Sequence, residues 1–76
     1  MISYTPLWKT MEDRGITTYT LITRHNFSHQ TIYNLRHNKS ITLYTLEKLC
    51  KILNTTADGI VVFLPDAADE TQDPLI

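Results

Sequence analysis

Residues that start and end helices alternate at short intervals along this chain, a pattern typical of a compact bundle of short helices. Thr5-Pro6 supplies a capping hydroxyl followed by proline, and Gly15 supplies the left-handed residue that ends a helix. Ser28 and Thr42 have hydroxyls suited to cap later helices, and Asn54 is suited to end one. The sequence therefore predicts a first helix that begins at Thr5-Pro6 and ends at Gly15.

Apolar residues at helical spacing support four such helices, and the fourth has the clearest amphipathic pattern. They are Leu7, Trp8 and Met11 in the first, Leu21 and Ile22 in the second, Ile32 and Leu35 in the third, and Leu43, Leu46, Leu49, Cys50 and Leu53 in the fourth. Thr17 or Thr18 can cap the second helix, and Asn38 can end the third.

A fifth helix is expected to start at Thr55 or Thr56 and to end at about Ile60 or Val61. The segment Ile60–Leu64 fits either helix or strand, because it is rich in β-prone residues yet follows a helix start. We expect an extended piece through Phe63 that pairs with the β-prone Ile2–Tyr4. The predicted fold is an all-α, five-helix domain over residues 1–65, with this terminal β pairing as an addition that the pattern leaves open.

The chain of 76 residues is long enough for one domain, and its charge is distributed unevenly. Residues 66–76 hold four acids and no Lys or Arg, so we expect an acidic, flexible tail. Residues 1–65 carry a net charge of +3, and no carboxylate occurs between Asp13 and Glu47, although Arg14, Arg24, Arg36, Lys39 and three histidines do. A polyanion could approach this segment without meeting a fixed negative charge.

Several classes of function are disfavoured by what the sequence lacks. The only cysteine is Cys50, which excludes an internal disulfide and a thiolate zinc cluster and fits a reducing cytoplasm. His25 and His29 have ligand-like spacing, but the turn between them interrupts the helix, so we expect no metal. We also expect no enzyme activity, no cofactor, no small-molecule ligand, no export signal and no membrane span.

The second and third predicted helices together form the pattern that points to a function. Two short helices joined by a tight turn at Asn26-Phe27-Ser28 are typical of the helix-turn-helix, which places its second helix in the major groove of DNA. Ser28 would bind phosphate at the start of that helix. His29, Gln30 and Asn34 lie on its exposed side, and side chains of these types can hydrogen-bond to base edges.

The segment Thr17–Lys39 (TTYTLITRHNFSHQTIYNLRHNK) resembles the helix-turn-helix of the Cro/C1-type, or XRE, family of regulators, and the resemblance extends from Leu7 to Ile60. It is most similar to the short stand-alone regulators of Gram-positive bacteria, such as those of mobile elements and vancomycin-resistance operons. One departure is Asn26, where the family usually has glycine, and asparagine tolerates the same left-handed conformation.

The resemblance implies a lambda-repressor-like domain that binds double-stranded DNA and regulates transcription, most commonly as a homodimer on a palindromic operator. It assigns base contacts to His29, Gln30 and Asn34, with Thr31 and Tyr33 near the edge of the groove. The residues predicted to contact DNA phosphates are Thr17, Thr18, Ser28, Arg36, Lys39 and Ser40. Apart from the resemblance, the apolar Ile60–Leu64 segment with Met1–Tyr4 is the candidate dimer surface, although it could equally close the monomer's own core.

A second hypothesis remains open at this stage. The weak net charge of −1 and the acidic tail also fit a protein-interaction module, such as an antitoxin or the binding partner of another regulator, with weak or no DNA binding. Salt-dependent DNA affinity distinguishes the two hypotheses.

Overall fold

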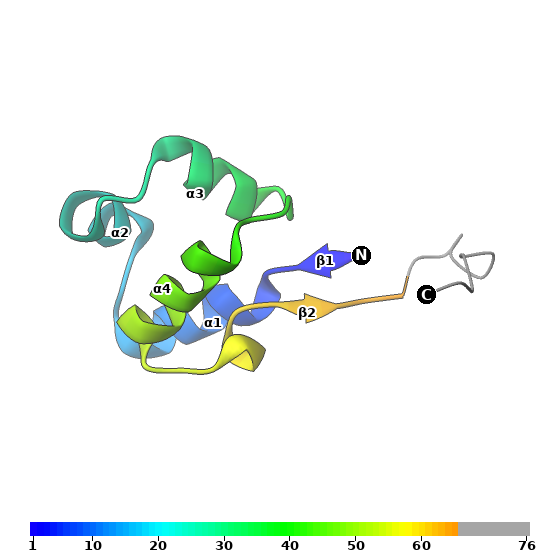
Figure 1. The fold of residues 1–76 in the computed structure, drawn as a ribbon. Helices are drawn as coiled ribbons and strands as arrows, with labels where there is room; N and C mark the ends of the chain where they lie inside the picture. The colour runs from blue at the N-terminus through cyan, green and yellow to red at the C-terminus, as the bar shows by residue number, and fades with distance from the viewer. Residues whose placement is uncertain (66–76) are drawn as a thin grey trace.

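A computed structural model describes residues 1–65 of the chain, and the predicted acidic tail at 66–76 lies outside them. Over the described part the fold is mostly helical, with four α-helices, one 3₁₀ helix and a two-stranded ribbon (Figure 1). In chain order the elements are β1 (Ile2–Ser3), α1 (Thr5–Arg14), α2 (Thr18–His25), α3 (His29–Arg36), α4 (Leu43–Leu53), η1 (Ala57–Gly59) and β2 (Val62–Phe63). Helices α1 and α4 pack together, α2 and α3 lie on one side of this pair, and the ribbon projects from the body (Figure 1).

Side-chain caps define three of the four helix starts. The hydroxyls of Thr17, Ser28 and Thr42 accept hydrogen bonds from backbone N–H groups three residues later, at 3.2, 3.1 and 3.1 Å. Each bond satisfies one of the N–H groups that a helix start leaves without an intrahelical partner. The predicted caps at Ser28 and Thr42 are confirmed, and Thr17 rather than Thr18 caps α2.

The predicted cap at Thr5 is wrong. Helix α1 already includes Thr5, and Tyr4 occupies the capping position without a side-chain bond. The backbone N–H of Thr5 instead donates to the Ser3 hydroxyl at 3.3 Å. Ser3 can reach this N–H because the chain enters the helix directly from β1, a geometry that the local pattern at Thr5-Pro6 does not reveal.

The predicted fifth α-helix is also wrong, since this segment forms only a three-residue 3₁₀ turn at Ala57–Gly59. The chain has to leave the helical path there, because Ile60 is fully buried and Val62 already belongs to the ribbon. The expected β pairing is confirmed: β1 and β2 are antiparallel, with Ile2 opposite Phe63 and Ser3 opposite Val62.

The core lies between α1, α4 and the inner faces of α2 and α3. Its buried apolar residues are Tyr4, Leu7, Met11, Leu21, Phe27, Ile32, Leu35, Leu49, Leu53 and Ile60. Leu43 does not join them as predicted, because it is 81% exposed. At about 100° per residue Leu43 lies roughly a quarter turn or more from the line of Leu49 and Leu53, so the apolar stripe of α4 is narrower than its composition suggests.

None of the helices in residues 1–65 combines the length and apolar character needed to cross a membrane.

Candidate nucleic-acid interface

The turn between α2 and α3 fixes the angle at which α3 is presented. Asn26 ends α2 in the left-handed conformation, with φ 60°, as predicted for this position. The N–H of Phe27 then donates to the Leu21 carbonyl at 3.1 Å, and the Phe27 side chain is buried. Ile32 and Leu35 hold one face of α3 in the core, so the opposite face is left exposed.

Gln30, which is exposed, and Asn34, which is half-buried, form a hydrogen-bonded amide pair on the outer side of α3. The Nε2 of Gln30 donates to the Oδ1 of Asn34 at 3.0 Å across one helical turn. This bond leaves the Oε1 of Gln30 as an acceptor and the Nδ2 of Asn34 as a donor. An acceptor and a donor side by side match the N6 and N7 edge of adenine. His29, at the first position of α3, is exposed at the end of the same helix.

The exposed face of α3 also includes Tyr33 and continues to His37, which the sequence did not single out. The rings of Tyr33 and His37 lie with their centroids 4.1 Å apart and their planes at 35°. His37 follows Gln30 by seven residues, or about two helical turns, and so extends the same face. Thr31 lies at the side of this face, where it is half-buried and its hydroxyl is 3.0 Å from that of Ser28.

The structure brings part of the predicted phosphate-binding set together beside α2. The Nη2 of Arg36 donates to the Thr18 hydroxyl at 3.1 Å, which joins the end of α3 to the start of α2. The Thr17 hydroxyl next to them caps α2 and lies 3.1 Å from the Thr20 hydroxyl. A guanidinium and hydroxyls at a helix start are groups that bind phosphate oxygens.

Of the remaining predicted phosphate contacts, Ser28 caps the start of α3, and Lys39 and Ser40 lie on the side of α3 opposite Arg36. Lys39 and Ser40 are exposed in the loop between α3 and α4, and the Lys39 N–H donates to the Asn34 carbonyl at 2.8 Å. Ser40 borders a shallow polar depression together with Thr31, Asn34, Ile41, Thr42 and Thr45. The two groups of predicted phosphate contacts therefore flank the exposed face of α3 instead of forming a single cluster.

Three residues of α4 extend this second flank and were missed from the sequence. Tyr44, Thr45 and Lys48 line a polar depression with residues of the turn before α3 and its first turn, Asn26, Phe27, Ser28 and Thr31. The Nζ of Lys48 lies 4.8 Å from the centre of the Phe27 ring, a cation–π distance that directs the lysine toward the start of α3. The spacing of 44, 45 and 48 places these residues on one helix face, which could have indicated their shared position.

No acidic residue occurs between Asp13 and Glu47, a stretch that includes α2, α3 and the loop after α3, whereas α4 carries Glu47 between Thr45 and Lys48. Asp13 pairs with Lys9 at 3.8 Å and Glu47 with Lys51 at 3.9 Å, each between exposed side chains along one helix.

Within residues 1–65, no three His, Cys, Asp or Glu side chains lie close enough to hold a metal ion. Burial, with a smaller effect of Glu47, raises the pKa of the Cys50 thiol, which disfavours its metal-binding thiolate form.

The sequence matches a known protein family, and the fold is similar to that of a solved structure. A sequence model of the Cro/C1-type HTH DNA-binding domain matches residues 6–66. The crystal structure of transcriptional regulator VanUg, Form II, is similar with a TM-score of 0.78 and 31% sequence identity, over 86% of this chain and 87% of that chain. No curated protein matches the chain.

Proposed function

Since this chain belongs to the Cro/C1-type helix-turn-helix family, we propose that it is a transcriptional regulator that binds double-stranded DNA in a sequence-specific manner. The observation that carries the proposal is the hydrogen-bonded amide pair of Gln30 and Asn34 on the exposed face of α3. Residues suited to bind phosphate flank that face on both sides, which supports the proposal because a helix in the major groove lies between two DNA backbones. We also expect the protein to act without enzyme activity or cofactor.

In this mechanism α3 lies in the major groove, and its flanks hold the two backbones. Arg36 and Thr18 contact one strand, and Lys39 with Ser40 contacts the other, assisted by Lys48 from α4. These contacts fix the depth and orientation of α3 but carry no sequence information. Sequence is read by Gln30 and Asn34 at an adenine edge, with His29 offering a donor to guanine N7 or O6.

Binding should weaken steeply with salt, and this is the test of the proposal. A binding site selected from a random DNA pool is titrated at several KCl concentrations by fluorescence anisotropy. Arg36→Ala is expected to reduce the slope of log affinity against log salt by about 0.9, the value for one lost phosphate contact on duplex DNA. Its effect should be the same on selected and random sequences, because a phosphate contact does not depend on the base.

The matched control is Lys51→Ala, which removes an equal charge from the exposed side of α4, where Lys51 pairs with Glu47. It should leave both slope and affinity nearly unchanged. If the wild-type protein selects no sequence and shows no salt-dependent binding at low ionic strength, the proposed function is wrong. The protein-interaction hypothesis would then take its place.

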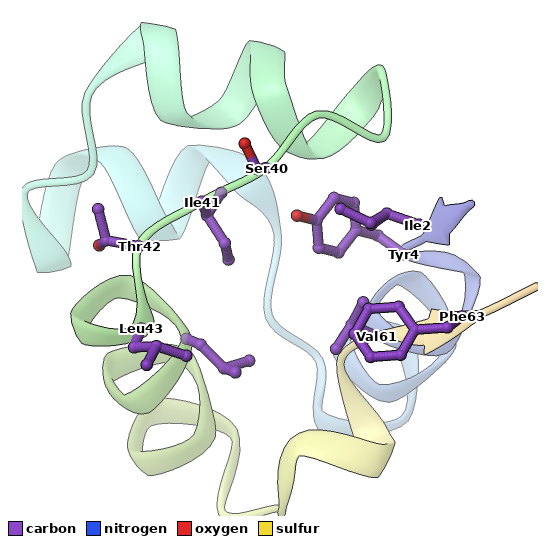
Figure 2. Close-up of a pocket in the computed structure, with 9 residues that line it drawn as sticks. Ile2, Tyr4, Ser40, Ile41, Thr42, Leu43, Val61 and Phe63 are labelled. Carbon is purple, nitrogen blue, oxygen red and sulfur yellow. The ribbon is translucent and has the colours of Figure 1, made fainter. Parts of the chain in front are cut away.

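The proposal includes a homodimer on a palindromic operator, and the ribbon is its contact surface. An apolar hollow of about 140 Å³ lies between the ribbon and the start of α4 (Figure 2). Phe63 and Leu43 border it from opposite sides, and both project into solvent, with Phe63 75% exposed. None of the residues that line the hollow carries a formal charge at neutral pH.

A two-fold interface uses the same patch on both subunits, so a projecting side chain beside a hollow can be complementary to its own copy. An uncharged patch also avoids the repulsion that two copies of the basic groups beside α3, Arg36, Lys39 and Lys48, would experience. These features support a ribbon-to-ribbon dimer, which would present two α3 helices to two half-sites about one helical turn apart.

Phe63→Glu is expected to weaken self-association about tenfold or more, because it places two carboxylates in an apolar contact. Sedimentation equilibrium at increasing protein concentration measures the effect. Tyr19→Glu is the matched control, since Tyr19 is similarly exposed but lies on α2, away from the ribbon. A wild-type protein that stays monomeric both free and on the selected DNA would contradict the dimer.

A further inference from the structure

Tyr4 connects the ribbon to the loop that follows α3. It lies between β1 and α1 and is only 2% exposed. Its backbone N–H donates to the Oδ1 of Asn38 at 3.1 Å, and its phenol donates to the main-chain carbonyl of Lys39 at 2.7 Å. Two consecutive loop residues are thus held by one residue that precedes them by more than thirty positions.

The loop depends on such outside support because its own backbone is irregular. Asn38 has a φ of 56°, and the loop connects the end of α3 at Arg36 to the cap of α4 at Thr42. The Lys39 N–H bonds back to the Asn34 carbonyl, while the Lys39 carbonyl is fixed by Tyr4. Both sides of the Lys39 main chain are therefore constrained, and with them the direction in which its side chain leaves the loop.

Tyr4 and the loop also share the wall of the apolar hollow. Figure 2 shows the Tyr4 ring beside Ile2, with Ser40 and Ile41 on the loop that borders the same space. Burial raises the pKa of the Tyr4 phenol above its usual value, so the group stays protonated and remains a donor over the physiological pH range.

We propose that Tyr4 is a positioning residue for the DNA phosphate contacts of Lys39 and Ser40, acting through the main chain of the Asn38–Ser40 loop. The inference rests on the proposed DNA-binding function but concerns a residue that contacts no DNA itself. A loop held in its binding geometry before it meets the phosphate loses less conformational freedom on binding. Without the Tyr4 bonds, that ordering has to occur during binding, which lowers the affinity, and the phosphate contacts of Lys39 and Ser40 form in only part of the complexes, which reduces the salt slope.

Tyr4→Phe tests this by removing the bond to the Lys39 carbonyl while keeping the buried ring. The selected DNA and a random duplex are titrated by anisotropy at several salt concentrations, at a temperature where urea unfolding shows the variant to be folded. We expect affinity to fall about 3- to 10-fold on both DNAs, which is the range for one net hydrogen bond, with a smaller salt slope. Base preference should not change.

A double-mutant cycle separates positioning from general destabilisation. In a Lys39→Ala/Ser40→Ala background, Tyr4→Phe should have almost no further effect on DNA affinity, because the contacts it positions are gone. Thr10→Val is the structural control, because it removes a partly buried hydrogen bond of 2.8 Å that the Thr10 hydroxyl donates to the Gly59 carbonyl, between α1 and η1. It should lower stability but leave affinity and salt slope unchanged.

Two outcomes would overturn the inference while leaving the proposed function intact: wild-type affinity and slope in Tyr4→Phe, or an undiminished effect of Tyr4→Phe in the Lys39→Ala/Ser40→Ala background. Failure of the wild-type protein to bind any DNA would instead contradict the proposed function itself.

If Tyr4→Phe does not fold, Asn38→Gly replaces it, since glycine keeps the left-handed backbone and removes the Oδ1 acceptor of the Tyr4 N–H. The same loss of affinity and slope is then expected, and unchanged values would again contradict the inference.

Discussion

Replacing Gln30 and Asn34 together by alanine is expected to lower affinity for the selected DNA by about 100-fold, since a well-formed bidentate base contact provides about 1–3 kcal/mol of discrimination. Binding to random duplex DNA should stay within about twofold, because the proposed phosphate contacts on either side of α3 remain. The variant would therefore still bind DNA but would no longer prefer one sequence. Competition titrations with selected and random duplexes measure both quantities.

The single substitutions should each remove most of this preference. Gln30 and Asn34 are joined by a hydrogen bond, so the loss of either side chain releases the other from its orientation. The control is Glu47→Ala/Lys51→Ala, which removes an exposed pair on α4 without changing the net charge. If the doubly substituted α3 retains its sequence preference, then base recognition has been assigned to the wrong residues.

Leu49→Ala is expected to lower the free energy of unfolding by about 2–5 kcal/mol, the range for a leucine removed from a packed core. Leu49 is fully buried in α4, the helix that packs against α1. A domain of this length has a total stability of only about 4–11 kcal/mol, so the variant would lose a large part of it. Urea unfolding followed by far-ultraviolet circular dichroism measures the change.

Leu43→Ala, in the same helix, is the matched control for this prediction. Its side chain is mostly exposed, so the expected change is within about 0.5 kcal/mol when measured at concentrations low enough for the monomer. Equal effects at positions 43 and 49 would contradict the assignment of Leu43 to the surface.

Features controlled by nearby residues could be predicted from the sequence. The hydroxyl caps at Ser28 and Thr42 depend on backbone atoms three residues away, and the left-handed turn at Asn26 depends on one residue's own conformation. These positions fixed the boundaries of α3, and with them the places of the exposed Gln30 and the half-buried Asn34 on the face opposite Ile32 and Leu35. The central part of the candidate interface could therefore be predicted before the structure was known.

Features controlled by distant residues could not be predicted. Leu43 has the spacing of a core residue, but its burial depends on how far the body extends beside the first turn of α4. Thr5 does not cap α1, because β1 places the Ser3 hydroxyl at the Thr5 N–H. The predicted fifth helix does not form, because Ile60 is buried in the core and the next residues pair with β1. Tyr4 belongs to the same group, since its link to Lys39 spans 35 positions of the sequence.

Trp8 gives the molecule an optical reporter of its own. It is the only tryptophan in the chain, and its half-buried ring borders a shallow depression together with Arg36 and His37 at the end of α3. Indole emission responds to the polarity and charge around the ring, so the arrival of a phosphate at Arg36 should change the fluorescence. Stopped-flow mixing could then follow the docking of α3 in real time, with no dye attached to either partner.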